Sequence, residues 1–337
     1  MLNMENKKIV FVEPWKVEVQ NESFIPELQS DEVIVKKIYS MVSPGTELAC
    51  LSGADDWFKM PGVPGYSSVS EIIEKGSNVK DFEVGDIVFH YGTHTKYEVT
   101  TTGGIFIKVP QNMELKRVPF TRMATIAMTS IRISQIELGD YVAVTGLGII
   151  GNMAAQLAKL QGARVIGMDI SEKRLKLASQ CGLYKGINSS NDDPREKVLE
   201  ITNGLGASTA IEATGIPKIA ADSLSWIGNF GEIILLGTPR GEYNANVTEI
   251  LRYCHLANFG SITFKGAHEW RYPVIPNEFI KHSLVRNSHI AFQLLMDNML
   301  VVDPLISHII APEEAQSAYD GLRFNKDAYN SVLFNWL

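Results

Sequence analysis

Short apolar runs separated by turns fill the first third of the chain. The runs are rich in Val, Ile, Phe and Tyr, and Gly- or Pro-containing turns such as 43–45, 61–62, 64–65, 85–86 and 103–104 lie between them. Such runs bounded by Gly and Pro are typical of β-strands. The expected strands are 8–12, 32–39, 68–74, 86–91, 97–101 and 105–109. Short strands at this spacing predict a small barrel or sandwich.

The pattern changes near Phe120, where apolar positions begin to recur with helical spacing. A helix over 123–135 is followed by a compact apolar strand over 141–145, a helix over 151–161, a strand over 164–168 and a helix over 172–181. Further elements are expected at 209–212, 219–226, 232–237 and 261–264. The tail predicts a helix at 287–298, a strand near 307–310, a helix at 312–321 and a strand at 331–334. Strands that alternate with helices indicate a parallel sheet covered on both faces, so the chain is expected to be α/β.

Composition narrows the class of protein. A length of 337 residues favours two domains, and a net charge of -7 gives no basic face for a nucleic acid. The three cysteines lie far apart and form no C-x-x-C pair, which argues against a disulfide framework and fits a reducing compartment. No stretch approaches the roughly 20 apolar residues of a membrane span, and the N-terminus lacks the apolar run of a signal peptide. A cytoplasmic protein without a membrane partner is therefore expected.

The segment 141–171 is the most informative of the sequence. Gly146, Gly148 and Gly151 form a G-x-G-x-x-G motif between a predicted strand and a predicted helix. These glycines permit a tight turn, a close approach to a pyrophosphate and close packing of helix on strand, while the helix N-terminus attracts the phosphates. The next strand ends at Asp169, which completes the pattern of a dinucleotide site. The candidate cofactor contacts here are Gly146, Leu147, Gly148, Ile149, Ile150, Gly151, Asp169, Ile170 and Arg174.

Asp169 also discriminates between cofactors. A carboxylate at this position can accept hydrogen bonds from the ribose hydroxyls and repels a 2′-phosphate, so NAD(H) is favoured over NADP(H). Lys173 and Arg174 weaken this preference, because a basic side chain there could reach a phosphate instead of lying on a solvated helix face.

The chain resembles the medium-chain dehydrogenase/reductase superfamily over nearly its whole length. The resemblance is carried by SPGTE at 43–47, by VSEIIEKGSNVKDFEVGDIV at 69–88, by GLGIIG at 146–151, by IEATG at 211–215 and by GEIILLG at 231–237. The branch that it resembles most contains the threonine and polyol dehydrogenases and the bacteriochlorophyllide dehydrogenase-like proteins that share SPGTE.

The resemblance implies a definite domain organisation. A β-rich GroES-like catalytic domain over 1–122 is interrupted by a Rossmann NAD-binding domain over 123–268 and completed by 269–337. It also implies that the nicotinamide pocket is lined by Ile150, Thr214, Gly237, Thr238 and the backbone near 266–268. A homodimer or homotetramer is expected, joined through edge strands near 258–265.

The sequence departs from the zinc-dependent members of this family. They have Cys-Gly-x-Asp where this chain has Pro44-Gly45-Thr46-Glu47, and Gly-His-Glu where it has Gly65-Tyr66-Ser67. Their third ligand falls near Arg122 or Met123. Proline and methionine offer no suitable hard donor and Arg122 adds a positive charge, so a zinc-free member with no metal ligands is predicted.

Without a metal, hydrogen-bond donors must stabilise the reacting oxygen. Thr46 matches the hydroxyl that relays protons in related alcohol dehydrogenases, and Tyr66 replaces the histidine ligand, so its phenol is a candidate general acid. Arg122 could bind an anionic group or depress the tyrosine pKa. Each has a structural alternative: a packed phenol, a capped turn and a paired guanidinium.

Other candidates lie in the polar aromatic loop 90–97 and at scattered positions. His90 is a further candidate acid or base. The candidate substrate contacts are Glu47, Trp57, Tyr91, His94, Lys96 and His268. Trp57 could equally anchor its own loop, and a single carboxylate such as Glu47 is not a metal site.

Three functions remain open from the sequence. The first is an NAD(H)-dependent, zinc-independent oxidoreductase that interconverts a secondary alcohol and a ketone on a polar sugar, cyclitol or related metabolite. The second is a zinc-free quinone or enoyl reductase acting on a C=C bond, a class that usually takes NADPH. The third is a nucleotide-binding protein without catalytic turnover.

Overall fold

The computed structural model describes residues 4–337. The chain divides into two compact units. The first contains the described chain up to Arg122 together with Val274–Met296 and Leu305–Leu337, and the second contains Met123–Pro273 and Asp297–Pro304. The chain therefore leaves the first unit after Arg122, returns to it over Val274–Met296, contributes Asp297–Pro304 to the second unit and ends in the first.

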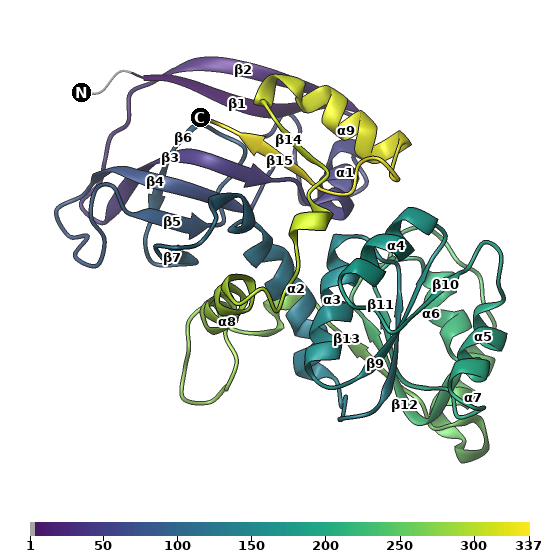
Figure 1. The fold of residues 1–337 in the computed structure, drawn as a ribbon. Coiled ribbons are helices and arrows are strands. Elements are labelled where there is room, and N and C mark those ends of the chain that lie inside the picture. The colour runs from purple at the N-terminus through teal and green to yellow at the C-terminus, as the bar shows by residue number, and fades with distance from the viewer. Residues whose placement is uncertain (1–3) are drawn as a thin grey trace. The chain divides into compact units, whose positions relative to one another are not determined.

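The first unit is built mainly from antiparallel strands. Strands β1 (Met4–Glu13) and β2 (Lys16–Phe24) form a hairpin of their own, and the larger sheet has the order β14-β15-β3-β4-β5-β7, with β6 paired to β3 (Figure 1). The strands of the larger sheet are β3 (Glu32–Met41), β4 (Ser68–Lys75), β5 (Ile87–His90), β6 (Tyr97–Thr101), β7 (Phe106–Lys108), β14 (His308–Ile310) and β15 (Val332–Asn335). The strands predicted here are confirmed, whereas β2 was not predicted because its sequence, KVEVQNESF, is mostly polar.

The helices of the first unit include one that was not predicted from the sequence. They are α1 (Pro44–Ser52), η1 (Leu115–Arg117), α8 (Leu284–Met296), η5 (Pro312–Glu314) and α9 (Ala315–Phe324). The prediction of a turn at 43–45 was wrong, because Ser43 is the N-cap of α1 and Pro44 its first residue. Proline is favourable there, since its missing N–H would have no partner in the helix and its fixed φ suits the first turn. Thr46 and Glu47 therefore lie in the first turns of a helix.

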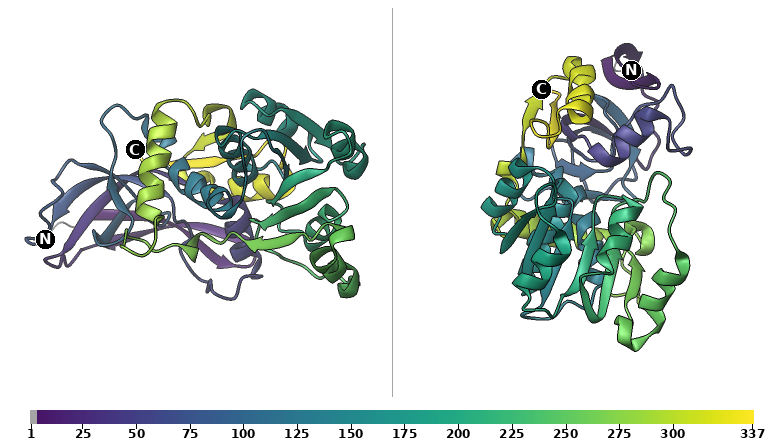
Figure 2. Two further views of the ribbon diagram at one scale, coloured as in Figure 1. Left: turned by 90° about the horizontal axis from the view of Figure 1, so that it is seen from below. Right: turned by 90° about the vertical axis from the view of Figure 1, so that its right-hand side faces the viewer.

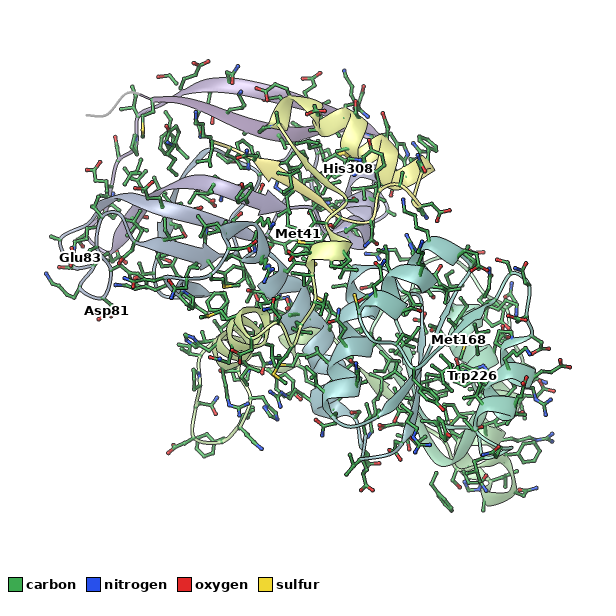
Figure 3. The ribbon with its side chains drawn as sticks, in the orientation of Figure 1. Met41, Asp81, Glu83, Met168, Trp226 and His308 are labelled. Atoms are coloured by element: carbon green, nitrogen blue, oxygen red, sulfur yellow. The ribbon has the colours of Figure 1, made fainter. Side chains whose placement is uncertain are left out.

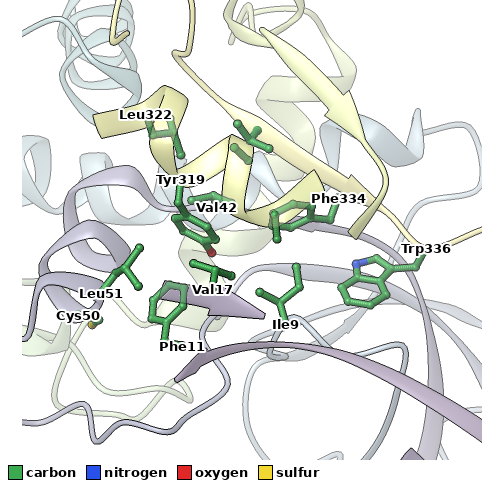
Figure 4. Packing of buried hydrophobic residues seen from close by; sticks show 13 residues of the cluster. Ile9, Phe11, Val17, Val42, Cys50, Leu51, Tyr319, Leu322, Phe334 and Trp336 are labelled. Atoms are coloured by element: carbon green, nitrogen blue, oxygen red, sulfur yellow. The ribbon is translucent and has the colours of Figure 1, made fainter. Parts of the chain in front are cut away.

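A single apolar cluster joins the two ends of the first unit. Figure 4 shows Phe11 from the N-terminal hairpin, Leu51 from α1, and Tyr319 and Phe334 from the C-terminal segment packed together. The ring of Phe11 meets that of Tyr319 edge-on, with 4.9 Å between centroids. Residues far apart in the sequence thus share one core, which explains why the tail returns to this unit.

The second unit is a parallel sheet of order β10-β9-β8-β11-β12-β13. Its strands are β8 (Tyr141–Thr145), β9 (Arg164–Asp169), β10 (Lys185–Asn188), β11 (Ala207–Glu212), β12 (Ile227–Leu235) and β13 (Thr263–Gly266). This order is that of a doubly wound Rossmann sheet, so the α/β prediction is confirmed. The direction of winding reverses between β8 and β11, and ligands of such sheets bind at the carboxyl ends of the strands on either side of that point.

Helices cover both faces of this sheet (Figure 2). The elements are α3 (Ile149–Leu160), α4 (Glu172–Gln180), α5 (Pro194–Ile201), α6 (Pro217–Ser223), α7 (Val247–His255), η2 (Ala257–Phe259) and η3 (Glu269–Arg271), with η4 (Asp303–Leu305) at the return and α2 (Phe120–Ile133) at the entry. The helices predicted as 151–161 and 172–181 are confirmed, whereas α5 and α7 were not predicted. Among residues 4–337, no helix combines the length and the apolarity needed to cross a membrane.

Side chains of this sheet form the core of the second unit. Met168 on β9 and Trp226 just before β12 are both buried in it, and Figure 3 marks their positions. In the first unit, Asp81 and Glu83 lie on the exposed connection between β4 and β5. The apolar sheet interior thus holds the strand ends, and the loops that follow them, in fixed places.

Candidate cofactor loop and candidate active site

The glycine motif forms a sharp elbow between β8 and α3. Gly146 has a φ of 83°, in the left-handed region that glycine adopts most readily. A Cβ on Gly151 would lie 1.7 Å from the Gly146 carbonyl oxygen, so no other residue fits there. A Cβ on Gly148, the N-cap of α3, would meet nothing within 4 Å. The backbone at Gly148 is therefore open to a ligand beside the N-terminus of a helix, which suits a pyrophosphate.

Loops after three neighbouring strands pack closely at this edge. A Cβ on Gly146 would lie 2.7 Å from Cγ2 of Thr214, which follows β11, and one on Gly237, which follows β12, would lie 2.3 Å from the nitrogen of Gly215. The buried carboxylate of Glu212 organises this contact, since it accepts hydrogen bonds from the backbone N–H groups of Thr214 at 2.7 Å and Gly215 at 3.1 Å. Burial raises the pKa of Glu212, and these hydrogen bonds oppose the rise.

Asp169 ends β9 beside the elbow. Its Oδ2 accepts from the N–H of Leu147 at 2.7 Å, and its Oδ1 accepts from the N–H of Ser171 at 2.9 Å. The guanidinium of Arg174 lies 3.7 Å from Oδ2. A carboxylate has about four acceptor positions, so this anchored group keeps capacity for ribose hydroxyls.

The remaining predicted cofactor residues surround the elbow. Ile149 and Ile150 are the first residues of α3, and the side chain of Ile170 is 73% exposed just after Asp169. The Thr238 carbonyl lies 2.3 Å from the position of a Cβ on Gly215, so it belongs to the same packed loops. The donors and the open backbone of this region fit a dinucleotide.

In the first unit, Tyr66 lies among hydroxyl groups and a cation. Its phenol is hydrogen-bonded to the side chains of Ser43 and Thr46. Burial raises the pKa of the Tyr66 phenol above its ordinary value, although the hydrogen bonds and the charge of Arg122 act to lower it. The lowering of the tyrosine pKa by Arg122 that the sequence suggested is present, but desolvation outweighs it. Tyr66 is therefore a neutral phenol at physiological pH.

The guanidinium of Arg122 lies between two aromatic rings. Its Cζ is 5.0 Å from the ring centroid of Tyr66 and 4.0 Å from that of Tyr91, and its Nη1 donates to the Tyr91 hydroxyl at 2.9 Å. Cations above aromatic faces are stabilised by the ring quadrupole. Five residues thus form one cluster, here called the hydroxyl cluster: Ser43, Thr46, Tyr66, Tyr91 and Arg122.

Glu47 and His94 are brought together beneath this cluster. Both are buried, with 3.0 Å between His94 Nε2 and Glu47 Oε2. Within residues 4–337, no group of three or more His, Cys, Asp or Glu side chains is arranged to hold a metal ion. The carboxylate of Glu47 also accepts from the N–H of Ser43 and from the Tyr319 hydroxyl, and both ring nitrogens of His94 have partners. These donor atoms do not fit a zinc ion as they stand.

His90, predicted as a catalytic residue, is placed differently. Its ring is 3% exposed and its Nε2 lies 2.8 Å from Ser70 Oγ inside the sheet. Burial, and then the charge of Lys37, hold the pKa of His90 well below its ordinary value. Lys37 is itself fully buried and paired with Glu98 at 3.0 Å. These contacts make His90 part of an internal polar cluster with Ser70 and the Lys37–Glu98 pair.

Three further candidates lie apart from the hydroxyl cluster in their contacts. The Trp57 side chain is 66% exposed and meets the ring of Phe58. Lys96 Nζ lies 5.6 Å from the ring centroid of Tyr97. His268 is an exposed residue of the second unit, at the N-cap of η3.

Several residues of these sites were not predicted from the sequence. Ser43 is bonded to Tyr66, and Tyr319 donates to the carboxylate of Glu47. Ser40 is bonded to His94 and accepts from Trp336. Only Ser43 carried a usable signal, since Ser followed by Pro is a common start of a helix.

Comparison with known proteins identifies relatives of this chain. Residues 150–277 match the family model described as "Zinc-binding dehydrogenase". D-guloside 3-dehydrogenase of Shigella flexneri is 30% identical over 267 residues, which span 76% of this chain and 73% of that protein. L-threonine 3-dehydrogenase of Proteus mirabilis is 26% identical over 93% of this chain and 94% of its own length.

Solved structures share the fold. Galactitol-1-phosphate dehydrogenase from Escherichia coli superposes with a TM-score of 0.83 at 22% identity, covering 98% of this chain and 99% of that chain. A structure described as a short chain alcohol dehydrogenase from Escherichia coli, complexed with NADH, has a TM-score of 0.82 at 18% identity, with coverage of 98% and 99%.

The sequence resemblance is therefore confirmed at the level of family. The doubly wound sheet, the glycine elbow and the guloside dehydrogenase relative all agree. The chain belongs to the zinc-type alcohol dehydrogenase-like proteins of the medium-chain dehydrogenase family.

Proposed function

We propose that this protein is an NAD(H)-dependent, zinc-independent oxidoreductase that interconverts a secondary alcohol and a ketone on a polar sugar, cyclitol or related metabolite. The observation that carries the proposal is the hydroxyl cluster. Tyr66 is hydrogen-bonded to the hydroxyls of Ser43 and Thr46 and lies beside the guanidinium of Arg122. Family members need a group that exchanges a proton with the substrate oxygen, and this cluster offers neutral donors for that purpose.

A bound nicotinamide would supply the hydride to a ketone or accept it from an alcohol. In the direction of ketone reduction, the Tyr66 phenol donates its proton to the carbonyl oxygen as general acid. The hydroxyls of Ser43 and Thr46, which are hydrogen-bonded to the phenol, can relay a proton to it from solvent, each taking up one proton as it gives up another. The positive charge of Arg122 stabilises the negative charge that develops on the phenol oxygen or the substrate oxygen during transfer.

Zinc independence is supported by the donor atoms at the positions of the family's ligands. Pro44 has no ligating atom, the oxygen of Tyr66 is engaged by two hydroxyls, and Arg122 is a cation. A tetrahedral zinc site needs several N, S or O ligands at about 2 Å, which these residues do not supply.

The choice of NAD(H) over NADP(H) is supported by Asp169. Its carboxylate is anchored by two backbone N–H groups at the end of β9, so a 2′-phosphate there would meet a fixed negative charge. Arg174 lies 3.7 Å from this carboxylate, which neutralises part of its charge.

The substrate class is supported by the relatives and by the character of the cluster. One relative is named for a guloside and a solved neighbour for galactitol 1-phosphate. Hydroxyl, phenol and guanidinium groups suit a ligand with many hydroxyls better than an acyl chain.

The deciding experiment is a substrate panel. Purified protein is assayed with NAD⁺ against polyols, cyclitols and glycosides, and with NADH against their ketones, each repeated with the 2′-phosphorylated cofactor. Turnover of a hydroxyl-rich substrate with NAD(H) supports the proposal. Reduction of quinones or enones with NADPH would replace it by the C=C reductase. Tight NADH binding without turnover of any compound would replace it by the non-catalytic function.

Tyr66→Phe is expected to lower kcat by about 10²–10⁴, because it removes the proton donor and little else. The Michaelis constant for NADH should not change, since the glycine elbow is untouched. Tyr243→Phe in the second unit, whose side chain is 42% exposed, is the matched control and should keep the wild-type rate. A wild-type rate in Tyr66→Phe would remove the phenol from the mechanism.

Metal removal tests zinc independence directly. Dialysis against a chelator should leave turnover unchanged, and elemental analysis of active protein should find zinc far below one ion per chain. Loss of turnover that added zinc restores would refute zinc independence while leaving the proposed substrate class in place.

We also propose a homo-oligomer joined through β13. This strand is at one end of the order of the six-stranded sheet, so one of its edges has no neighbour in that sheet. Unpaired strand edges readily pair with another chain. Sedimentation velocity should give a dimer or tetramer, and a monomer at micromolar concentration would contradict this.

A cytoplasmic location is part of the proposal. It is supported by Cys50, Cys181 and Cys254, which are all free thiols, as is usual in a reducing compartment. Cell fractionation should recover the protein with soluble cytoplasmic markers.

A further inference from the structure

His94 contacts the two backbone segments that carry Tyr66 and Thr46. These are the turn at 64–66 and the first turn of α1. Its backbone N–H donates to the Pro64 carbonyl at 2.8 Å, two residues before Tyr66. Its ring lies against Gly65, where a Cβ would come within 2.9 Å of ring atoms Cγ and Nδ1. Gly65 has a φ of 102°, so a side chain at this position is excluded both by backbone conformation and by the ring. His94 is thus packed directly beneath the turn that presents Tyr66.

The same ring reaches the turn that presents Thr46. Nε2 of His94 lies 3.0 Å from Oε2 of Glu47, the residue after Thr46, and Oε1 of Glu47 accepts from the Ser43 N–H at 2.8 Å. The carboxylate therefore closes the first turn of α1 onto its N-cap residue. Through Glu47, His94 is connected to Ser43 and Thr46, the two hydroxyls bonded to Tyr66.

One assignment of protons satisfies every hydrogen bond of this network. The indole N–H of Trp336 can only donate, and it donates to Ser40 Oγ at 2.9 Å. Ser40 in turn lies 2.7 Å from Nδ1 of His94, and its hydroxyl proton can satisfy that nitrogen as an acceptor. The Nε2 proton of His94 is then available to Glu47, which also accepts from the Tyr319 hydroxyl at 2.5 Å. A neutral imidazole with its proton on Nε2 satisfies all of these atoms at once.

The members of this chain are buried and come from distant parts of the sequence. His94, Ser40 and Glu47 are 0%, 0% and 1% exposed, and Tyr319 and Trp336 are 1% and 4% exposed. Figure 4 shows Tyr319 and Trp336 as part of the apolar cluster of the first unit. Buried hydrogen bonds to a carboxylate are strong and directional, and leaving one unmade is costly. The network therefore holds its members in one arrangement.

We propose that His94 is a positioning residue, which holds the Thr46 turn and the Tyr66 turn in the register that joins their hydroxyls. This inference rests on the proposed function, because it assigns to the network the task of orienting the proposed proton donor. His94 itself takes no part in proton transfer to the substrate. The sequence-based prediction that Glu47 and His94 contact substrate is replaced by this role.

Two substitutions of His94 separate positioning from simple packing. The Nε2 of a glutamine can reach the place of the imidazole Nε2 and donate to Glu47, whereas asparagine is too short. His94→Asn is expected to lower kcat by about 10-fold to 100-fold, since small misplacements of reacting groups have effects of this size. His94→Gln should stay within about three-fold of wild type, a difference below the 1.4 kcal/mol that corresponds to ten-fold. The Michaelis constant for NADH should be unchanged in both variants.

The matched control is His289→Asn, at an exposed position on α8. It makes the same chemical change away from both turns and should leave kcat unchanged. Equal losses in His94→Asn and His94→Gln, or a wild-type rate in His94→Asn, would overturn the proposal, because the donor to Glu47 would then not matter.

A spectroscopic readout tests the positioning without turnover. The protein is labelled with 3-fluorotyrosine, and the fluorine resonance of Tyr66 is assigned by its absence in Tyr66→Phe. This resonance should shift and broaden in His94→Asn and remain in place in His94→Gln and His289→Asn. An unmoved resonance in His94→Asn would refute the positioning role even if no substrate were found. If instead the resonance moves but no compound of the substrate panel is turned over, the positioning stands and the proposed function fails.

Discussion

Single residues of the first unit show how burial sets protonation. His90 and Lys37 are both buried in the same sheet, and burial lowers the pKa of each. For His90 this means that the folded protein prefers the neutral imidazole, while the unfolded chain keeps an ordinary histidine pKa near 6.5. The contribution of His90 to stability is then complete above pH 6.5 and is lost as the pH falls below it.

The linkage between His90 protonation and folding predicts a pH dependence of the unfolding free energy that the His90→Gln substitution removes. Between pH 7.5 and 5.5 the wild type should lose up to about 1.4 kcal/mol more unfolding free energy than His90→Gln, which cannot take up that proton. Urea unfolding at the two pH values measures the difference. Parallel pH dependence in the two proteins would mean that His90 titrates normally in the folded state.

Gly92 packs against the same polar cluster. A Cβ at this position would lie 2.3 Å from Lys37 Nζ, 2.3 Å from His90 Cε1 and 2.7 Å from Glu98 Oε2. Gly92→Ala should therefore destabilise the protein by about 1–3 kcal/mol, as overpacking does. Gly103→Ala is the control, since a Cβ there meets nothing within 4 Å. Equal midpoints of urea unfolding for the two variants would show that the cluster adapts without strain.

At the scale of elements, two glycines of the elbow between β8 and α3 have different roles. Gly151 is needed for folding, and Gly148 is needed for cofactor binding. Gly151→Ala should destabilise the second unit by about 2 kcal/mol or more, because its Cβ would lie 1.7 Å from the Gly146 carbonyl oxygen. Gly148→Ala should fold normally, since its Cβ would project into open space. The same methyl would obstruct the approach of a pyrophosphate, so NADH affinity should fall by about ten-fold or more.

Two measurements check this pair. Thermal unfolding gives the stability of each variant, and the quenching or enhancement of NADH fluorescence on titration gives the affinity. Wild-type affinity in Gly148→Ala would argue that the dinucleotide does not cross the elbow.

The return of the C-terminal segment is the other feature at this scale. Strand β15 pairs with β3, and Tyr319 on α9 donates to Glu47 on α1. The tail therefore supplies both a sheet strand and a hydrogen-bond donor beneath the hydroxyl cluster.

At the scale of the whole molecule, the division into two units predicts a localised effect of cofactor. A ligand that binds only the folded form stabilises it by about 2.7 kcal/mol at 100 times its dissociation constant. NADH should therefore slow hydrogen exchange in β8, β9 and α3 of the second unit. The β1–β2 hairpin of the first unit should exchange at its original rate, because the predicted cofactor contacts are all in the second unit.

Hydrogen exchange read by mass spectrometry, with Gly148→Ala as the weaker-binding control at an NADH concentration near the wild-type dissociation constant, tests this expectation. Protection that is equal in the hairpin and the elbow would indicate that the cofactor stabilises both units together.

The sequence alone determined what depends on neighbours in the chain. The glycine elbow, Asp169 at the end of its strand and the alternation of strands and helices are local patterns, because the tight turn and the amphipathic period involve only nearby residues. The signal for the start of α1 was also local. Ser-Pro-Gly is compatible both with a turn and with a helix N-terminus, and a turn was predicted.

Only the tertiary structure decided the partners of Tyr66, Glu47 and His94. Glu47 lies 47 positions from His94 and 272 from Tyr319 in the sequence, so no local pattern relates them. Burial likewise settled the protonation of His90 and the raised pKa of Tyr66, because desolvation depends on atoms brought in from the whole unit. The residue types at the site could thus be read from the sequence, whereas their roles follow from the long-range contacts that fold and bury them.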